Sequence, residues 1–331
     1  MTATNLSRSA AHRLFRLLLP IAVLAAGTNL SYAQATREWQ RHFSTSIAEP
    51  VILQVDLSHG DLQIAYAREG EVSIKLSARS SSGTEIDENY FAAHILIDQS
   101  GNKMFIREQP SASALDRSIR MAFQIDVPYR TQIQTRVVTG KQSITGVMGP
   151  VTAQSGNGDI EVEYVSNAVT AEAGTGNLDL QVLGAKIDAK TGTGNISCSR
   201  APQGVNAETT DGDITLMVVG SSQAIIKSGA GRIEVGGVRG TLLASTVAGD
   251  LHVKAVPHDD WQLKSVSGNI RVELPPQSGF EIHAATQTGT VIVGRDDLEK
   301  PNIEVRHVDQ KANGGGKRIE LHTGAGKIVI S

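Results

Sequence analysis

The chain has 331 residues, of which 40% are hydrophobic, 20% are charged and only 4% are aromatic, and its formal net charge is −3 at pH 7. The single cysteine, Cys198, excludes an intrachain disulfide, and the absence of lysine and arginine runs argues against a nucleic-acid partner. The low aromatic content means that any aromatic platform for sugars would have to be small.

Residues 1–33 have the pattern of a signal peptide. Arg8, Arg13 and Arg16 precede an apolar stretch from Leu17 to Gly27, which is too short to cross a bilayer because a spanning helix needs about 20 residues. Small residues at 31–33 predict cleavage before Gln34, which removes three arginines and changes the formal charge from −3 to −6. An uncleaved anchor is the alternative. No cysteine follows the leader to carry a lipid, so we expect an exported chain without a transmembrane segment, whether periplasmic, outer-surface or secreted.

Residues 34–138 are predicted to form a β-rich region continuous with the repeats that follow. One early unit, "HGDLQIAY", has the phase of the later repeats, with Leu62 and Ile64 pointing inward after Gly60. The segment from Ser77 to Ala93 and the stretch 108–120 are expected to leave the sheet as loops or a short helix. We expect this region to cap one end of the stack, because an uncovered strand edge recruits other strands.

Residues 139–331 are organised by a glycine repeat. The marker glycines follow one another at steps of 18, 18, 18, 18, 19, 18, 19 and 21 residues, and the last step of 37 is close to two units and could hold a degenerate coil. A fixed period of this size is the signature of stacked repeats. The markers are Gly140, Gly158, Gly176, Gly194, Gly212, Gly231, Gly249, Gly268, Gly289 and Gly326.

Apolar residues alternate with polar ones on both sides of each marker. In the unit of Gly158, Val151 and Ala153 precede the glycine and Ile160 and Val162 follow it, which predicts two half-buried strands joined by a glycine turn. A constant unit length brings like residues into register on neighbouring strands. The sequence therefore predicts an all-β fold, a parallel β-solenoid of about ten coils with repeats of about 18 residues, and an antiparallel meander is the alternative.

These motifs resemble a known family. The leader, "HGDLQI", "QIDVP", the glycine-marked units and the final "IELHTGAGKIVIS" are similar to bacterial β-strand-repeat domains of unknown function, often labelled candidate adhesins. The resemblance covers nearly the whole chain after the leader and implies an envelope or secreted β-solenoid. It brings no catalytic residues. The unit of Gly140 departs from the pattern because Gln142 stands where an apolar residue is expected, which leaves the start of the first coil open.

The residue after each marker is mostly Asp or Asn. Asp159, Asp213 and Asp250 could bind calcium, as glycine-aspartate repeats do, but those repeats run nine residues with paired glycines. Asn and Asp also bond the backbone in turns. We therefore expect a structural turn or ladder in this column: Asp61, Asp159, Asn177, Asn195, Asp213, Arg232, Asp250 and Asn269.

Other candidate sites have simpler interpretations. Glu161 and Asp179 share an outward column on adjacent units, as a sugar-cleaving pair would, but no basic residue accompanies them in that column. Cys198 and Trp261 occupy inward columns, which favours core positions over a nucleophile and a sugar platform. The histidines lack the spacing of a metal cage and are expected at the surface: His59, His252, His258 and His283.

The sequence therefore predicts a non-catalytic, exported protein with no cofactor and no metal, acting in binding, adhesion or envelope structure. The partner is expected to be a glycan or an envelope protein. A periplasmic accessory or sensing module is the first alternative, and a polysaccharide-active enzyme is the second.

Overall fold

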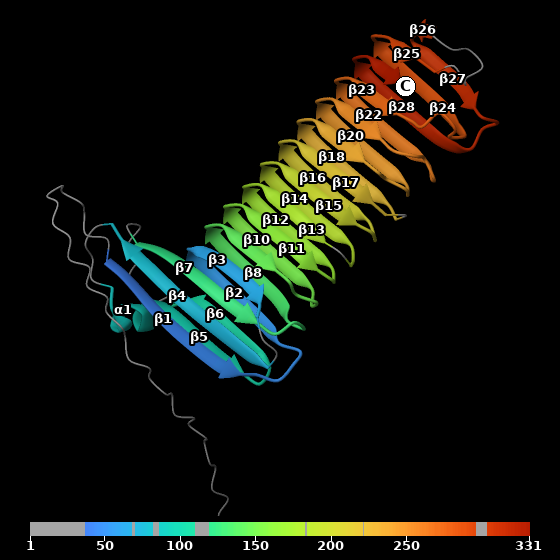
Figure 1. The fold of residues 1–331 in the computed structure, drawn as a ribbon. Coiled ribbons are helices and arrows are strands. Elements are labelled where there is room, and N and C mark those ends of the chain that lie inside the picture. Colours follow the sequence, from blue (N-terminus) through green and yellow to red (C-terminus); the bar gives the residue numbers. More distant parts are fainter. Residues whose placement is uncertain are drawn as a thin grey trace, which may run out of the picture. The chain divides into compact units, whose positions relative to one another are not determined.

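The structure is a computed structural model that describes residues 37–67, 70–81, 86–109, 119–182, 184–220, 222–295 and 303–331. Ala35–Ser331 form one compact unit, and the leader predicted at residues 1–33 lies outside the described residues. Two long sheets of 15 and 14 strands face each other across the core (Figure 1). The predicted parallel β-solenoid is confirmed.

Each coil gives one strand to each sheet and turns between them at its marker glycine. Neighbouring coils pair in parallel and in register, so that Val151 lies beside Val169 in the second sheet and Ile160 beside Leu178 in the first. The antiparallel alternative is wrong for the repeating coils. Among the described strands, antiparallel pairing is confined to β1–β4, β4–β7, β5–β6, β24–β27 and β25–β26 at the two ends.

The strands of the 15-stranded first sheet are, in spatial order, β1 (Arg37–Ser46), β4 (Glu71–Ser80), β7 (Ile119–Val127), β3 (Asp61–Tyr66), β9 (Gln142–Thr145), β11 (Ile160–Val165), β13 (Leu178–Val182), β15 (Ile196–Ala201), β17 (Ile214–Val219), β19 (Ile233–Gly236), β21 (Leu251–Lys254), β23 (Ile270–Glu273), β29 (Ile328–Ile330), β25 (Val291–Val293) and β26 (Ile303–Val305).

Those of the 14-stranded second sheet are β27 (His307–Ala312), β24 (Phe280–Thr288), β28 (Lys317–Ala325), β22 (Trp261–Ser267), β20 (Leu242–Ala248), β18 (Ala224–Ala230), β16 (Val205–Asp211), β14 (Ile187–Thr193), β12 (Val169–Thr175), β10 (Val151–Asn157), β8 (Gln132–Thr139), β2 (Ile52–His59), β6 (Lys103–Glu108) and β5 (Ile95–Ser100).

The marker glycines lie where no other residue fits. From Gly158 to Gly268 their φ angles lie between 146° and 159°, a region that L side chains rarely adopt. A Cβ atom at any of them would also lie only 1.9–2.3 Å from the backbone oxygen of the preceding coil's marker. The period of the sequence therefore follows from the close approach of successive turns: Gly158, Gly176, Gly194, Gly212, Gly231, Gly249 and Gly268.

The core is a thin layer between the two sheets, filled by the predicted inward columns. Ile160, Val162, Val151 and Ala153 are all at most 1% exposed, and the other coils repeat this pattern. Each aliphatic side chain buried in this way stabilises the fold by roughly 1.5–3 kcal/mol relative to exposure. Because one coil alone cannot cover both of its faces, stability depends on stacking.

The unit of Gly140 is a regular coil despite its polar inward residue. Gln142 is fully buried, and its amide is satisfied at both ends. The Thr135 hydroxyl donates to Gln142 Oε1 at 2.5 Å, and Gln142 Nε2 donates to the Gln154 carbonyl at 2.7 Å. A buried amide with both partners present costs little, so the polar residue does not interrupt the stack.

The N-terminal region continues the stack before closing it. The coil of Gly60, made of β2 and β3, lies directly on the coil of Gly140. Beyond it, β6 and β7 add parallel strands, and β5, β4 and β1 add antiparallel ones. The expectation of an excursion from Ser77 is wrong at its start, because β4 runs to Ser80 with Ala78 buried, and a helix, α1 (Glu88–His94), follows.

Among the described residues, no helix has the length and apolar character needed to cross a membrane.

The last coils are stacked in a different order from the chain. Strands β28 and β29 of the Gly326 coil pair with the Gly268 coil on one side and the Gly289 coil on the other. The described part of the 37-residue step holds β26 and β27, which run antiparallel to β25 and β24, so a degenerate coil there is a wrong prediction. These strands cover an end whose cap is not evident in the sequence.

Candidate binding edge

The coils have two edges with different properties. At the glycine edge, defined by Gly60 and the ten later markers, each second-sheet strand turns into a first-sheet strand. At the return edge, defined by the residue six positions after each marker, the first-sheet strand ends and the chain passes to the next coil.

The Asp and Asn column of the glycine edge forms a ladder between coils. The side chain of one coil accepts a hydrogen bond from the backbone N–H of the same position in the next, as from Asn177 N to Asp159 Oδ1 at 2.7 Å. The same bond links Asn177 to Asn195, Asn195 to Asp213, Asp213 to Arg232, Asp250 to Asn269 and Asn269 to Lys327 at 2.7–2.9 Å.

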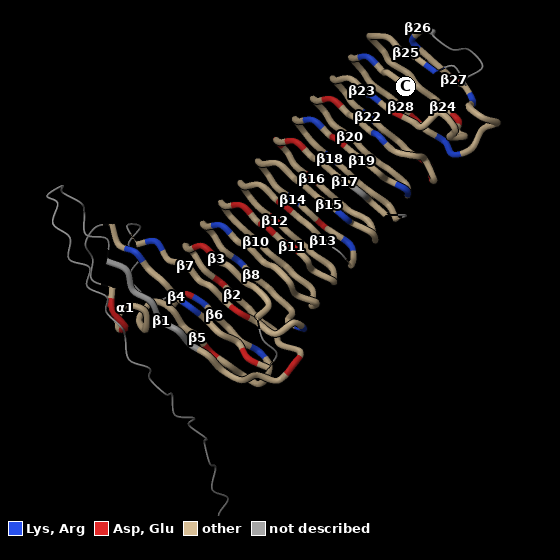
Figure 2. The backbone as a smooth tube through the Cα atoms, in the orientation of Figure 1, with Lys and Arg blue, Asp and Glu red and all other residues tan. Residues whose placement is uncertain are grey.

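Each run of the ladder ends on a basic residue, which has no acceptor to offer the next coil. The runs start at Asp61, Asp159 and Asp250 and end at Lys141, Arg232 and Lys327. Figure 2 shows the resulting succession of acidic and basic residues at the turns. Glu161, Asp159 and Asp61 all raise the pKa of Lys141, Glu161 most through its hydrogen bond.

Each of the three aspartates considered as calcium ligands thus uses one carboxylate oxygen in a hydrogen bond within the fold. Oδ1 of Asp159, Asp213 and Asp250 each accepts a backbone N–H at 2.7–2.8 Å. In the described part of the chain, no group of three or more His, Cys, Asp or Glu side chains is arranged to hold a metal ion. This geometry supports the ladder interpretation of the column.

A row of buried hydroxyls also holds the glycine turns. Thr191 Oγ1 donates to the Gly176 carbonyl at 2.9 Å, and Thr209 Oγ1 donates to the Gly194 carbonyl at 3.0 Å. Ser228, Thr246, Ser265, Thr286 and Thr323 repeat the contact. Each of these bonds ties a coil to the turn of the coil stacked before it.

The two outward carboxylates lie side by side, and one of them is paired with a lysine. Glu161 and Asp179 are paired in register on β11 and β13. The Lys141 ammonium is 3.0 Å from Glu161, so a basic residue does reach this column, from the neighbouring Asp and Asn column. A partly exposed carboxylate held by lysine on a flat sheet face has the environment of an ordinary surface ion pair.

The two candidates in the inward columns lie in the core. Cys198 is 2% exposed, and burial, with a smaller effect of Asp179, raises the pKa of its thiol to about 12. Trp261 is 1% exposed, and its indole N–H donates to the Gly240 carbonyl at 3.3 Å. Neither side chain is available to a ligand.

The four histidines are spread over the chain. His258 is exposed, whereas the other three are half-buried. His252 Nε2 lies 3.2 Å from Glu273, and His283 is paired with Asp309, which also faces His307. These histidines, His283 first, hold the pKa of Asp309 below its ordinary value.

The return edge varies from coil to coil, unlike the glycine edge. Four of its residues have a left-handed backbone: Gly146 (φ 75°), Tyr164 (φ 55°), Arg200 (φ 58°) and Gly237 (φ 67°). This conformation costs a residue other than glycine roughly 1–2 kcal/mol. Tyrosine and arginine therefore stand where glycine would satisfy the backbone at lower cost.

Exposed tyrosines gather at the N-terminal part of this edge. Tyr66, at the end of β3, is 45% exposed, Tyr129 is 38% exposed and Tyr164 is 50% exposed. The rings of Tyr66 and Tyr129 meet edge to face, with centroids 5.5 Å apart. Met148, which is 43% exposed, lies next to this pair, because its backbone N–H donates to the Tyr129 carbonyl. We call Tyr66, Tyr129, Met148 and Tyr164 the tyrosine patch.

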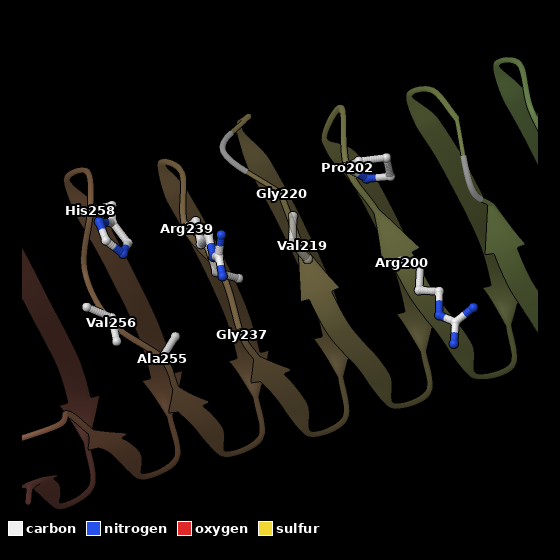
Figure 3. A pocket seen from close by; sticks show the side chains of 10 residues that line it. Arg200, Pro202, Val219, Gly220, Gly237, Arg239, Ala255, Val256 and His258 are labelled. Carbon is white, nitrogen blue, oxygen red and sulfur yellow. The ribbon is translucent and has the colours of Figure 1, made fainter.

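A shallow groove of about 700 Å³ follows further along the return edge (Figure 3). We call it the basic groove, because three of its residues are Arg200, Arg239 and His258, all exposed. Its remaining lining carries no carboxylate and is largely apolar: Pro202, Val219, Gly220, Gly237, Val238, Ala255 and Val256.

The cations of the basic groove have no acidic partner in the part of the chain that the structure describes. Within the described residues, no carboxylate forms an ion pair with Arg200 or Arg239. Asp259, next to His258 in the chain, faces Lys317 at 3.2 Å instead. An anion could therefore approach these groups without displacing a side chain of the described fold.

A second hollow adjoins the groove and shares Ala255 and Val256 with it. It adds Lys254, Arg271 and Glu273, and the Glu273 carboxylate is 2.8 Å from Arg271 Nε and 3.6 Å from Lys254 Nζ. The hydrogen bond from Arg271 is the main cause that lowers the pKa of Glu273. Lys254 and Arg271 therefore share the Glu273 carboxylate in this hollow.

Sequence reasoning missed both the tyrosine patch and the basic groove. It followed the residues that repeat, whereas these residues interrupt the repeat. The signal was present at the sixth position after each marker, where Tyr66, Tyr164 and Arg200 alternate with glycine and valine.

Comparisons with known proteins place the chain among repeat proteins of this kind. The model of the family described as Toastrack DUF4097 matches residues 53–331. No match is found among curated proteins.

Two solved structures illustrate the likeness. A candidate adhesin from Bacteroides fragilis NCTC 9343 is 15% identical, with 90% of this chain and 99% of that chain covered and a TM-score of 0.35. A candidate adhesin from Parabacteroides distasonis ATCC 8503 is 10% identical, with 88% and 97% covered and a TM-score of 0.41.

Proposed function

The chain belongs to the Toastrack DUF4097 family, and from the properties of its surface we propose that it is an exported, non-catalytic binding protein that holds an anionic ligand at the return edge. The observation that carries the proposal is the basic groove, whose lining contains Arg200, Arg239 and His258, together with apolar residues and no carboxylate.

The chemistry of the groove supports an anion with an apolar face. Arginine guanidinium groups recognise carboxylates and phosphates through paired N–H donors, and such charge-assisted bonds are among the stronger hydrogen bonds. Pro202 and Val256, which are both exposed, supply apolar surface in the groove, above the buried Val219 and Val238. A ligand with both properties gains from each part of the groove.

A binding role is also supported by what the candidate reactive groups do. The Cys198 thiol is buried, and its pKa of about 12 keeps it protonated near neutral pH. Glu161 is held by Lys141, and the ladder carboxylates accept backbone N–H groups. The proposal of export is supported by the arginines and apolar stretch at residues 8–27, the pattern of a cleaved leader.

Binding to immobilised polysaccharides tests the proposal. The probes are polygalacturonate, which carries carboxylates, teichoic acid, which carries phosphodiesters, and dextran, which is uncharged. We expect retention on an anionic matrix and none on dextran, with affinity reduced at least about tenfold in Arg200→Ala/Arg239→Ala, because two charge-assisted contacts are lost.

The control variant removes two positive charges from a surface away from the return edge. Lys227 and Lys264 are exposed on the outer face of the second sheet, and Lys227→Ala/Lys264→Ala is expected to bind like the unaltered chain. Equal losses in both double variants would mean that only net charge is sensed. Equal retention on dextran and on the anionic matrices would contradict an anionic ligand.

A further inference from the structure

Over the five coils from Gly60 to Gly194, large exposed side chains occur at every second coil of the return edge. The residues six positions after the markers are, in spatial order, Tyr66, Gly146, Tyr164, Val182, Arg200, Val218, Gly237 and Ala255. Tyr66, Tyr164 and Arg200 are exposed, Gly146 between the first two has no side chain, and Val182 between the next two is buried. The outward groups therefore repeat at two rungs, or about 9.6 Å, because neighbouring strands lie about 4.8 Å apart.

The tyrosines present ring surface to solvent. Tyr66 and Tyr164 are 45% and 50% exposed, and the edge-to-face contact with Tyr129 fixes the orientation of Tyr66 without stacking a second ring parallel to it. Parallel aromatic walls would suit a proline-rich peptide that inserts between them. A single exposed ring face instead suits a flat partner whose C–H groups lie over the ring, as the faces of sugar rings do.

Arginine continues the row toward the basic groove. Arg200 has the same left-handed backbone as Tyr164, two rungs further along. In Figure 3 its guanidinium points away from Arg239 and His258, on the side of the earlier coils that carry the tyrosines. The tyrosine patch and the basic groove thus join into one row over neighbouring coils.

We infer that the return edge binds an extended acidic polysaccharide along the coil axis, with sugar rings on Tyr66 and Tyr164 and acidic groups on Arg200 and the basic groove. This inference rests on the proposed function, which needs only an anion in the groove, and adds the class of ligand and its direction. A polymer with a repeating unit matches a row of contacts with a constant step better than a compact ligand does.

The first test is the dependence of affinity on chain length. Galacturonate oligomers of increasing length are titrated into the full mature chain by calorimetry. Affinity is expected to rise at least about tenfold once an oligomer spans the four rungs from Arg200 to Tyr66, about 19 Å. A short acid bound as tightly as a long chain would overturn the inference and leave the proposed function intact.

The second test removes the ring surfaces. Tyr66→Ala/Tyr164→Gly is expected to lower affinity for long polygalacturonate at least about tenfold and to leave the binding of digalacturonate unchanged. Val247→Ala/Val266→Ala is the matched control, since both valines are exposed, at 58% and 62%, next to glycine-edge turns. Melting temperatures of all variants report folding independently.

The outcomes distinguish anion binding in the basic groove from polysaccharide binding along the return edge. Full affinity in the tyrosine variant, with loss in Arg200→Ala/Arg239→Ala, would overturn the polysaccharide row while the anion-binding groove stands. No binding of any anion by the unaltered chain would overturn both. Preferential capture of an acidic proline-rich peptide over polygalacturonate, lost in the tyrosine variant, would also overturn the inference, because it would assign the row to a peptide.

Discussion

The glycine edge and the return edge of the coils follow opposite rules. At the glycine edge a Cβ atom on Gly212 would lie 2.1 Å from the Gly194 oxygen, so the turn cannot change from coil to coil. At the return edge Gly146, Tyr164 and Arg200 share one backbone conformation with different side chains. A position whose Cβ atom would meet the backbone of the neighbouring coil is therefore restricted to glycine, whereas at Gly146 the nearest atom to a Cβ would be 3.4 Å away and the equivalent positions carry tyrosine and arginine.

The repeats differ in length at the return edge. The steps from Gly212 to Gly231 and from Gly249 to Gly268 contain 19 residues, yet the paired strands stay in register. The additional residue lies between β17 and β18 in one case and between β21 and β22 in the other, where the chain passes to the next coil. The additional residues of the longer repeats therefore lie in the same segments that line the basic groove.

Breaking the glycine edge is expected to give the largest effect. Gly212→Ala would have to tolerate a φ of 151° and a Cβ atom 2.1 Å from a backbone oxygen. We expect a loss of at least about 3 kcal/mol in the free energy of unfolding, measured in urea. Gly101→Ala is the control, because its φ is also positive, at 61°, but no atom lies within 4 Å, and its loss should stay near 1 kcal/mol. Equal losses would show that contact between turns is not the cause.

The core between the two edges should show a pH effect through Cys198. Burial raises the pKa of its thiol to about 12, whereas the thiol of the unfolded chain ionises near 8.5. The protonated thiol therefore contributes stability that is complete below about pH 8.5 and is lost as the pH rises toward 12.

The measurement is the unfolding free energy of the unaltered chain and of Cys198→Val at pH 8 and pH 10. We expect the difference between them to change by about 2 kcal/mol in favour of the variant, because only the unaltered chain can ionise there. An unchanged difference would mean that the thiol is accessible to water in the folded state.

A smaller effect is expected from the hydroxyl row of the glycine edge. Thr209→Val removes the bond from Thr209 Oγ1 to the Gly194 carbonyl and keeps the shape of the side chain, so we expect a loss of about 1 kcal/mol. Ser155 is the contrast, because its buried hydroxyl has no hydrogen-bond partner among the described residues, and Ser155→Ala is expected to be neutral or stabilising. Thermal unfolding of both variants tests the pair, and equal losses would contradict this role of the row.

The smallest effect is expected from calcium. Because Asp159, Asp213 and Asp250 already accept backbone N–H groups, millimolar calcium added to metal-free protein should leave the melting temperature unchanged within about 1 °C. Magnesium serves as the control for ionic strength. A rise of several degrees with calcium alone would show that the column binds the metal and is more than a ladder.

The sequence predicts the glycine edge and the core far better than the return edge and the ends. Inward residues such as Ile160 and Val162 repeat because register forces like residues together, so one chain displays the rule many times. The insertion of β28 and β29 between earlier coils leaves no trace in the local pattern, since the Gly326 unit has the same alternation as its neighbours and pairs in parallel on both faces. Tyr66 and Tyr164 were missed because tyrosine does not repeat from unit to unit at this position. Both residues also lie beyond the part of each unit in which apolar and polar residues alternate.

The most direct test of this division of roles is the affinity of Tyr164→Gly/Arg200→Gly for long polygalacturonate, measured beside its urea unfolding curve. Glycine adopts the left-handed backbone conformation of both positions without steric strain. We expect unfolding at the same or a higher urea concentration, together with at least about a hundredfold loss of affinity. A stable variant that still binds polygalacturonate with full affinity would contradict the assignment of recognition to the return edge.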